Sequence, residues 1–279
     1  MVCSKFSYNA LQSENWIVKI DNLQIINGGQ TCKTILHTVK ENSAIDYSNT
    51  YVLIRLYELS GEEGSDSLIT DVTIATNSQN PVDLRDLRAN DDLQKNLEIA
   101  ISDLGFFYKR KKDTISSSSD KTILSSVAAE SIYSIWKEKP FLAKFKKREL
   151  FGLYYKDIFK DINGAQLIIA VLIYRYCDVQ RKKQVLIQEY PHIPYSNFFI
   201  SMFLGKLLLN ELNLTLNQLT HKEFERSKKY FEQNRENLFN KANIKLTDAL
   251  QRLYPDGYDK IDKRRLAATF RRGDLLEII

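Results

Sequence analysis

The chain has 279 residues, of which 43% are hydrophobic and 27% charged, and its formal net charge is +5. These proportions exclude global disorder and are ordinary for a globular protein that can bury a core. Its 40 basic residues against 35 acidic ones permit contact with nucleic acid. They do not by themselves indicate it, because a nucleic-acid-binding protein usually concentrates its charge on one face. With only 10 glycines and 5 prolines, the composition favours helices.

The cysteines and histidines exclude two common kinds of site. Three widely spaced cysteines indicate a reducing compartment rather than a disulfide scaffold, and three isolated histidines offer no zinc site. The first ten residues contain no apolar run of signal-peptide length. The most apolar stretch, residues 167–176, is too short to span a bilayer. We therefore expect a cytoplasmic protein with no membrane partner and no metal cluster.

The first part of the chain is predicted to mix strands and helices. Strands are favoured where polarity alternates or β-branched and aromatic side chains gather, and helices where apolar residues recur every three or four positions. Predicted strands cover residues 1–8, 16–20, 23–26 and 51–59, and predicted helices cover residues 30–39 and 68–77.

After Pro81 the apolar spacing is helical almost to the C-terminus. Predicted helices cover residues 83–88, 91–104, 123–136, 144–159, 165–181, 195–210, 222–240 and 244–253, with an extended piece at 106–112. The fold class is therefore α+β, with a small N-terminal mixed α/β part, residues 1–115, followed by a mostly helical part, residues 120–279. The Ser-rich stretch at 116–119 is the predicted boundary.

The sharpest local signal is a double glycine between an apolar strand and a helix. Two glycines let the backbone adopt positive φ and let a ligand approach it closely, and the start of the next helix offers free N–H groups to an anion. The spacing does not match a Walker A loop. A tight turn with no ligand is the commoner explanation of such a pair. If a phosphate binds, its candidate ligands are Asn27, Gly28, Gly29, Gln30, Thr31, Lys33 and Thr34.

A second signal is an Asn-rich segment, residues 75–87, that surrounds Pro81. Asn77 and Asn80 suit turns and helix caps, and a proline near a helix start is ordinary. Asp83 and Asp86 would share a helix face and could form an acidic cluster, although a solvated helix start is the commoner explanation.

Taken together, these segments resemble the abortive infection phage resistance (AIPR) family. Residues 26–31 and 75–82 are similar to its two best-marked motifs, at a similar interval. A third similar stretch follows in residues 128–132, 139–140 and 150–159, so the resemblance covers about residues 1–175. It implies a phage-defence component.

One departure concerns the start of the chain. Members of the family usually have a longer N-terminal region, often nuclease-like, that ends in an Asn- and Gly-containing strand just before residue 1 of this chain. We therefore expect a truncated member, a fragment or one half of a split gene, and no nuclease residue of that region is carried over to this sequence.

The Gly-Gln turn also resembles the ParB/sulfiredoxin-like nucleotide-binding fold. Asn27 stands where that group has an acidic residue, and Thr31 stands where an arginine is frequent, so the resemblance implies binding more than hydrolysis. It also implies that a nucleotide, bound with Mg²⁺, would lie between residues 28–31 and the later pair Asn77 and Gln79.

Four basic stretches are candidates for contact with nucleic acid. They cover residues 109–112, 144–148, 181–183 and 263–272, and the first two have aromatic neighbours that could stack on bases. Solvated helix faces explain such runs more often. The most concentrated run supplies the candidate contacts Arg264, Arg265, Arg271 and Arg272.

Three hypotheses follow. The preferred one is a phage-defence component that binds a nucleotide or a nucleic-acid phosphate through the Gly-Gly turn. The alternative is a nucleic-acid-binding or partner-docking module that serves a nuclease on a separate chain, with no small ligand. A hydrolase acting on nucleotide or nucleic acid ranks third, because no acid–base set can be assigned from the sequence.

Overall fold

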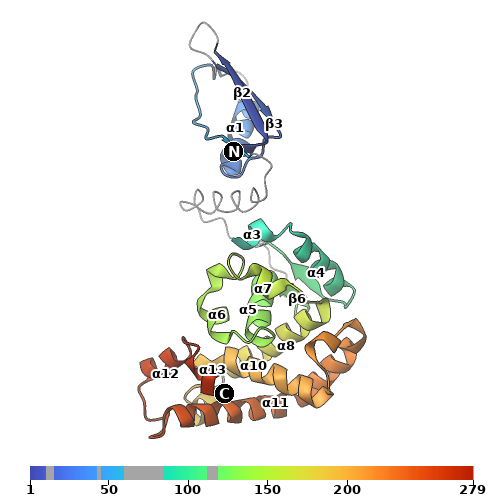
Figure 1. Cartoon of the computed structure of the whole chain (residues 1–279), viewed down its shortest axis with the longest axis vertical. Helices are drawn as coiled ribbons and strands as arrows, with labels where there is room; N and C mark the ends of the chain where they lie inside the picture. The colour runs from blue at the N-terminus through green and yellow to red at the C-terminus, as the bar shows by residue number, and fades with distance from the viewer. Residues whose placement is uncertain (11–15, 43–44, 60–83, 112–118, 279) are drawn as a thin grey trace. The chain divides into compact units, whose positions relative to one another are not determined.

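A computed structural model describes residues 1–10, 16–42, 45–59, 84–111 and 119–278 (Figure 1). The chain divides into two compact units, Met1–Val82 and Asp83–Ile279. This division lies earlier than the Ser-rich stretch, whose flanking strands belong to one sheet of the second unit. The predicted helix at residues 68–77 and the predicted loop at residues 116–118 lie outside the described residues.

The described residues of the first unit form two small two-stranded sheets and one helix. β1 (Val2–Cys3) pairs in parallel with β4 (Tyr57–Glu58), and β2 (Lys5–Ala10) pairs antiparallel with β3 (Trp16–Asp21). Both residues of β1 are buried. The predicted strand at 23–26 is reduced to a single bridge between Gln24 and Val2, and the one at 51–59 is reduced to β4, because only these residues find a partner strand.

The helix of this unit, α1 (Gly29–Glu41), confirms the helical spacing predicted for residues 30–39. It begins directly after the two-glycine turn. All 13 of its residues are described, and none is buried, so its side chains are open to solvent in this unit.

The second unit is almost wholly helical. Its elements are α3 (Leu84–Arg88), α4 (Asp92–Ser102), β5 (Phe107–Lys109), β6 (Thr122–Leu124), α5 (Ser125–Ile135), α6 (Pro140–Phe145), η1 (Lys147–Glu149), α7 (Tyr155–Phe159), α8 (Gly164–Gln180), α9 (Gln184–Glu189), α10 (Ile193–Leu212), η2 (Leu216–Gln218), η3 (His221–Glu223), α11 (Phe224–Leu253), α12 (Lys263–Thr269) and α13 (Asp274–Ile278). The predicted helical part is thus confirmed, with the short parallel pair β5–β6 added to it.

The core of this unit forms where α5, α8 and α10 pack together, and α11 runs along α10 (Figure 1). Nearly every residue in the first half of α8 and of α10 is buried, which explains their continuous apolar sequence. A capping box starts α8: Asn163 Oδ1 accepts from the Gln166 N–H, and Gln166 Oε1 accepts from the Asn163 N–H, each at 3.0 Å.

Three predicted helices are divided differently in the structure. The segment predicted as one helix over 144–159 is broken after Phe145, and an aromatic cluster of Phe151, Tyr155 and Phe159 forms beyond the break. The segments predicted as two helices, 222–240 and 244–253, form the single helix α11. Buried Ala242 and Asn243 lie at the predicted interruption, and no glycine or proline lies within α11 to break it.

Candidate functional site

The two-glycine turn has the backbone geometry that its sequence suggests. Gly28 has φ 85° and ψ 13°, a left-handed conformation that a side chain disfavours, and its carbonyl accepts the first helical hydrogen bond from the Cys32 N–H at 2.9 Å. The N-cap residue, Gly28, has no side chain to cap α1, and no acidic residue lies in the first turn of this helix. A Cβ on Gly28 or Gly29 would meet nothing within 4 Å in the described part of the chain.

These features leave a helix start that attracts anions. The first N–H groups of a helix have no intrahelical partner, and they carry the positive end of its dipole. Gln30, Thr31, Lys33 and Thr34 are all exposed on the first turns. Asn27 is exposed as well, and it takes part in an interaction of its own. The turn is an open surface, and the other predicted wall, Asn77, Gln79 and Asn80, lies outside the described residues.

The predicted arginine contacts lie at the end of the second unit. Arg264 and Arg265 are exposed in the first turn of α12, where the Asp262 carboxylate caps the helix by accepting from both of their backbone N–H groups at 2.9 and 3.0 Å. Arg271 and Arg272 follow that helix and are also exposed. The Arg271 guanidinium lies 5.6 Å from the Phe145 ring centroid, so this run meets another of the basic stretches.

The basic stretch at 109–112 offers little surface for stacking. Phe106 and Tyr108 are buried, and the Tyr108 hydroxyl donates to Gln94 at 2.8 Å. Arg110 forms an ion pair with Glu98 at 3.0 Å. Only Phe107 of these aromatic neighbours is exposed, because alternate residues of β5 face the core and the solvent.

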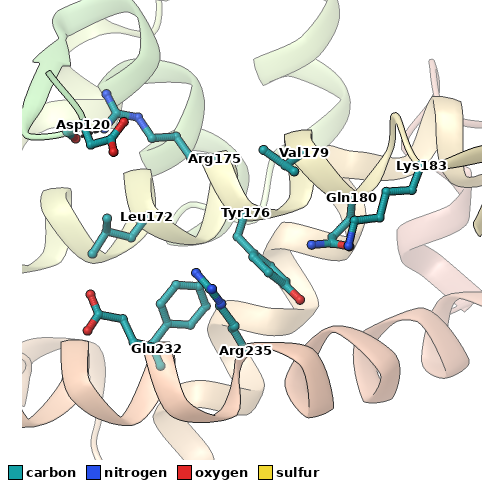
Figure 2. A pocket seen from close by; sticks show the side chains of 10 residues that line it. Asp120, Leu172, Arg175, Tyr176, Val179, Gln180, Lys183, Glu232 and Arg235 are labelled. Atoms are coloured by element: carbon teal, nitrogen blue, oxygen red, sulfur yellow. Dashed lines mark hydrogen bonds between the residues drawn. The ribbon is translucent and has the colours of Figure 1, made fainter. Parts of the chain in front are cut away.

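A pocket of about 480 Å³ lies between α8 and α11 (Figure 2). Tyr176 reaches into it from α8, and the Arg235 guanidinium on α11 lies 5.2 Å from the Tyr176 ring centroid. The lining residues are Asp120, Leu172, Arg175, Tyr176, Val179, Gln180, Lys183, Phe231, Glu232 and Arg235. The sequence predicts the Leu, Ile and Tyr residues of 165–208 as core. It does not reveal that the half-buried side chains of α8 line a pocket.

The charges of this pocket are largely engaged within the protein. Arg175 donates to the backbone carbonyls of Asp120 and Thr122, which ties α8 to the β6 edge. Arg235 lies against Tyr176, and Glu232 lies 3.9 Å from Lys228. With both carboxylates and cations on its walls, the pocket has no single charge sign to select a ligand.

A histidine–serine pair is present, but it is closed off from solvent. His192 Nδ1 lies 3.0 Å from Ser196 Oγ, and its Nε2 lies 3.2 Å from Thr247 Oγ1, so a hydroxyl stands where a catalytic triad has a carboxylate. His192 and Ser196 are both fully buried. Burial lowers the pKa of His192 to about 3 and raises the pKa of the Cys177 thiol to about 12, so neither is set up as a base or nucleophile at neutral pH.

The described residues contain neither of two further features, a metal-ligand cluster and a membrane-spanning helix. In that part of the chain, no cluster of three or more His, Cys, Asp or Glu side chains could hold a metal ion. No helix there is long and apolar enough to cross a membrane.

Comparison with known proteins gives one match. No curated protein and no solved structure is significantly similar to the chain, so the resemblance to the ParB/sulfiredoxin-like fold stays a prediction. The AIPR protein family matches residues 1–264, well beyond the residues 1–175 that carry the recognisable motifs. Because this match spans both compact units and nearly the whole sequence, the chain belongs to the AIPR family of phage-defence, abortive infection proteins.

Proposed function

We propose that this AIPR protein acts in phage defence by binding a phosphate group, of a nucleotide or a nucleic acid, at the start of α1. The observation that carries the proposal is an exposed helix start whose N-cap is a glycine and whose first turn holds no acidic residue. Open space beside Gly28 and Gly29 allows a ligand to reach the backbone N–H groups.

The side chains of the first turns add to this backbone site. The Gln30 amide and the Thr31 and Thr34 hydroxyls can donate hydrogen bonds to phosphate oxygens, and Lys33 adds a positive charge. Asn27 and Thr31 supply no acid–base pair, so the proposed activity is binding of the phosphate rather than its hydrolysis. Asn77, Gln79 and Asn80 are proposed to close the other side of a bound nucleotide.

A thermal-shift screen of the four nucleoside triphosphates with Mg²⁺ tests this proposal, because a ligand bound only by the folded state raises its stability. We expect a rise in Tm that Gln30→Ala and Gly29→Val both abolish. Lys33→Ala should reduce the rise, whereas Lys40→Ala, which removes the same charge from the last turn of the same helix, should leave it unchanged. A rise that survives Gly29→Val would refute binding at this turn.

The second candidate function is a nucleic-acid-binding module that serves a nuclease on a separate chain. The observation that favours it is the exposure of Arg264, Arg265, Arg271 and Arg272 at one end of the second unit. Salt-sensitive binding of DNA or RNA with no Tm shift for any nucleotide would support this function over the first. Metal-dependent cleavage by the chain alone would instead support the third hypothesis, a hydrolase.

A further inference from the structure

We propose that a surface around Phe145 in the second unit binds single-stranded nucleic acid, with a base stacked on the Phe145 ring and phosphates held by the cations beside it. This Phe145 surface consists of Lys144, Phe145, Lys147, Arg181 and Arg271. The proposal rests on the second candidate function, and it names the kind of strand and the place where that strand binds.

The surface is assembled from three basic stretches that are far apart in the sequence. Lys144 and Phe145 end α6, Arg181 follows α8, and Arg271 follows α12. Two cations lie against the Phe145 ring: Lys144 Nζ is 5.4 Å from its centroid, and the Arg271 guanidinium carbon is 5.6 Å from it. Folding thus concentrates on one face the charge that the sequence distributes over about 130 residues.

The pKa of Lys144 reflects the burial of this side chain and the cations gathered around it. Burial, together with the positive charges of Arg181, Lys147 and Arg271, lowers the pKa of its ammonium group to about 8. Its Nζ donates to the Tyr195 carbonyl, a neutral acceptor. An anion bound among these cations would relieve their mutual repulsion, which is the electrostatic condition for a phosphate site.

Among the described residues, two carboxylates pair with cations of this surface. Glu130 accepts from Lys147 Nζ at 2.8 Å, and Asp178 pairs with Arg181 at 2.5 Å and with neighbouring Lys182 at 2.9 Å. Among the ion pairs of the described residues, none involves Lys144 or Arg271. No carboxylate of the described residues therefore neutralises these two cations.

The aromatic ring determines the kind of strand. Phe145 is 41% exposed and lies among charged neighbours. A nucleobase can stack on such a ring whatever its identity, but only if the base is not already stacked and paired inside a duplex. The combination of one exposed ring and flanking cations therefore selects a single strand over a double strand.

Fluorescence anisotropy with the full chain tests the proposal. The probes are a labelled oligo(dT) and a labelled oligo(U) of roughly 20 nucleotides, long enough for the site sizes of such proteins, and a DNA duplex of equal length. Phe145→Ala should raise Kd for both single strands about tenfold, the loss of one stacked base, and Arg271→Gln should raise it several-fold. The duplex should bind more weakly and be insensitive to Phe145→Ala.

Two control variants test whether the loss of single-strand binding is specific to the Phe145 surface. Ile244→Ala removes another exposed large apolar side chain of the second unit, and Arg252→Gln removes an exposed arginine from the last turn of α11. Each should change Kd less than about twofold, because surface changes away from a site have small effects. Far-UV circular dichroism and Tm should confirm that all variants remain folded.

The outcomes separate the two proposals. Binding of single strands that Phe145→Ala leaves unchanged would overturn the Phe145 surface and leave the nucleic-acid function standing. Equal affinity for the duplex and the single strands would overturn the choice of strand. If no probe binds at low salt, near 50 mM, where phosphate contacts are strongest, both the surface and the second candidate function fail.

Discussion

Replacing His192 with glutamine should make the stability of the second unit less sensitive to acid. His192 is fully buried, with its two ring nitrogens near the hydroxyls of Ser196 and Thr247. The rings packed beside it belong to Tyr190 and Tyr258, whose phenols stay neutral in acid. Burial lowers the pKa of the imidazole from 6.5 to about 3, because the protonated ring would lose its hydration.

The sign and size of the effect follow from this shift. Between pH 3 and pH 6.5 the unfolded state binds a proton at this position that the folded state does not, so stability falls as the pH drops below 6.5. At about pH 4.5, roughly two units below the unfolded pKa, the penalty is about 2.7 kcal/mol, at 1.36 kcal/mol per unit. Above pH 6.5 both states are neutral and the penalty disappears. Glutamine keeps hydrogen-bonding groups near Ser196 and Thr247 but does not titrate.

Urea titrations at about pH 7 and about pH 4.5 measure this difference. The chain has two tryptophans, so a Trp16→Phe background leaves Trp136, at the end of α5, as the only reporter of the second unit. We expect the histidine protein to lose about 2.5 kcal/mol more than the His192→Gln variant between the two pH values. Burial raises the pKa of Glu130, so this residue makes the protein more stable as the pH falls, opposite to His192. Its contribution is equal in both proteins and cancels in the comparison. Equal acid sensitivity of the two proteins would refute the reasoning.

Two further predictions concern glycines. Gly28→Ala should lower the free energy of unfolding of the first unit by about 1 kcal/mol, because alanine is disfavoured in the left-handed conformation, while Gly29→Ala should cause no loss. Native-state hydrogen exchange of the α1 amides would measure both, and equal losses would contradict the turn geometry. Gly164→Ala should cost about 1–3 kcal/mol, since its Cβ would lie 2.8 Å from the backbone oxygen of Ala100. Gly273→Ala, which meets only the Phe141 ring at 3.4 Å, should leave Tm within a few degrees of the original.

The long helices could be predicted because each carries its own signal. The apolar runs of α8 and α10 and the cap at Asn163 are local features, and the predicted limits of α8 differ from the observed ones by one residue at each end. The errors lie where tertiary contacts determine the secondary structure. Residues 144–159 have helical periodicity, yet burial of Phe151, Tyr155 and Phe159 in one cluster favours a broken path.

Strands were harder to predict because a strand exists only with its partner. Residues 51–59 have a strong β-forming composition, but only β4 pairs, with β1, and the apolar residues before it stay exposed. The β2–β3 hairpin was predictable since its two segments are neighbours in the sequence. The parallel pair β5–β6 was not, because residues 122–124 continue directly into the apolar pattern of α5.

The two candidate sites also differ in whether the sequence alone could locate them. The turn before α1 could be located from sequence, because two adjacent glycines mark it in any context. The Phe145 surface could not, since Lys144, Arg181 and Arg271 meet only after α6, α8 and α12 have folded. One local signal did point to it, an aromatic residue within a basic run. The exposure of that ring depends on the end of α6 at Phe145, which periodicity missed.

The two sites belong to different compact units, and this separation makes their roles testable against each other. If each binds its own ligand, Gln30→Ala should abolish nucleotide-dependent stabilisation without changing Kd for oligo(dT), and Phe145→Ala should do the reverse. The double variant should then show both losses with no coupling energy beyond about 0.5 kcal/mol, as expected for independent sites. A single strand that contacts both units would behave otherwise: Gln30→Ala alone would weaken oligo(dT) binding, because the second contact raises affinity through effective concentration. Measuring Kd for the two single variants and the double variant with one long oligonucleotide therefore distinguishes two independent sites from one continuous nucleic-acid path.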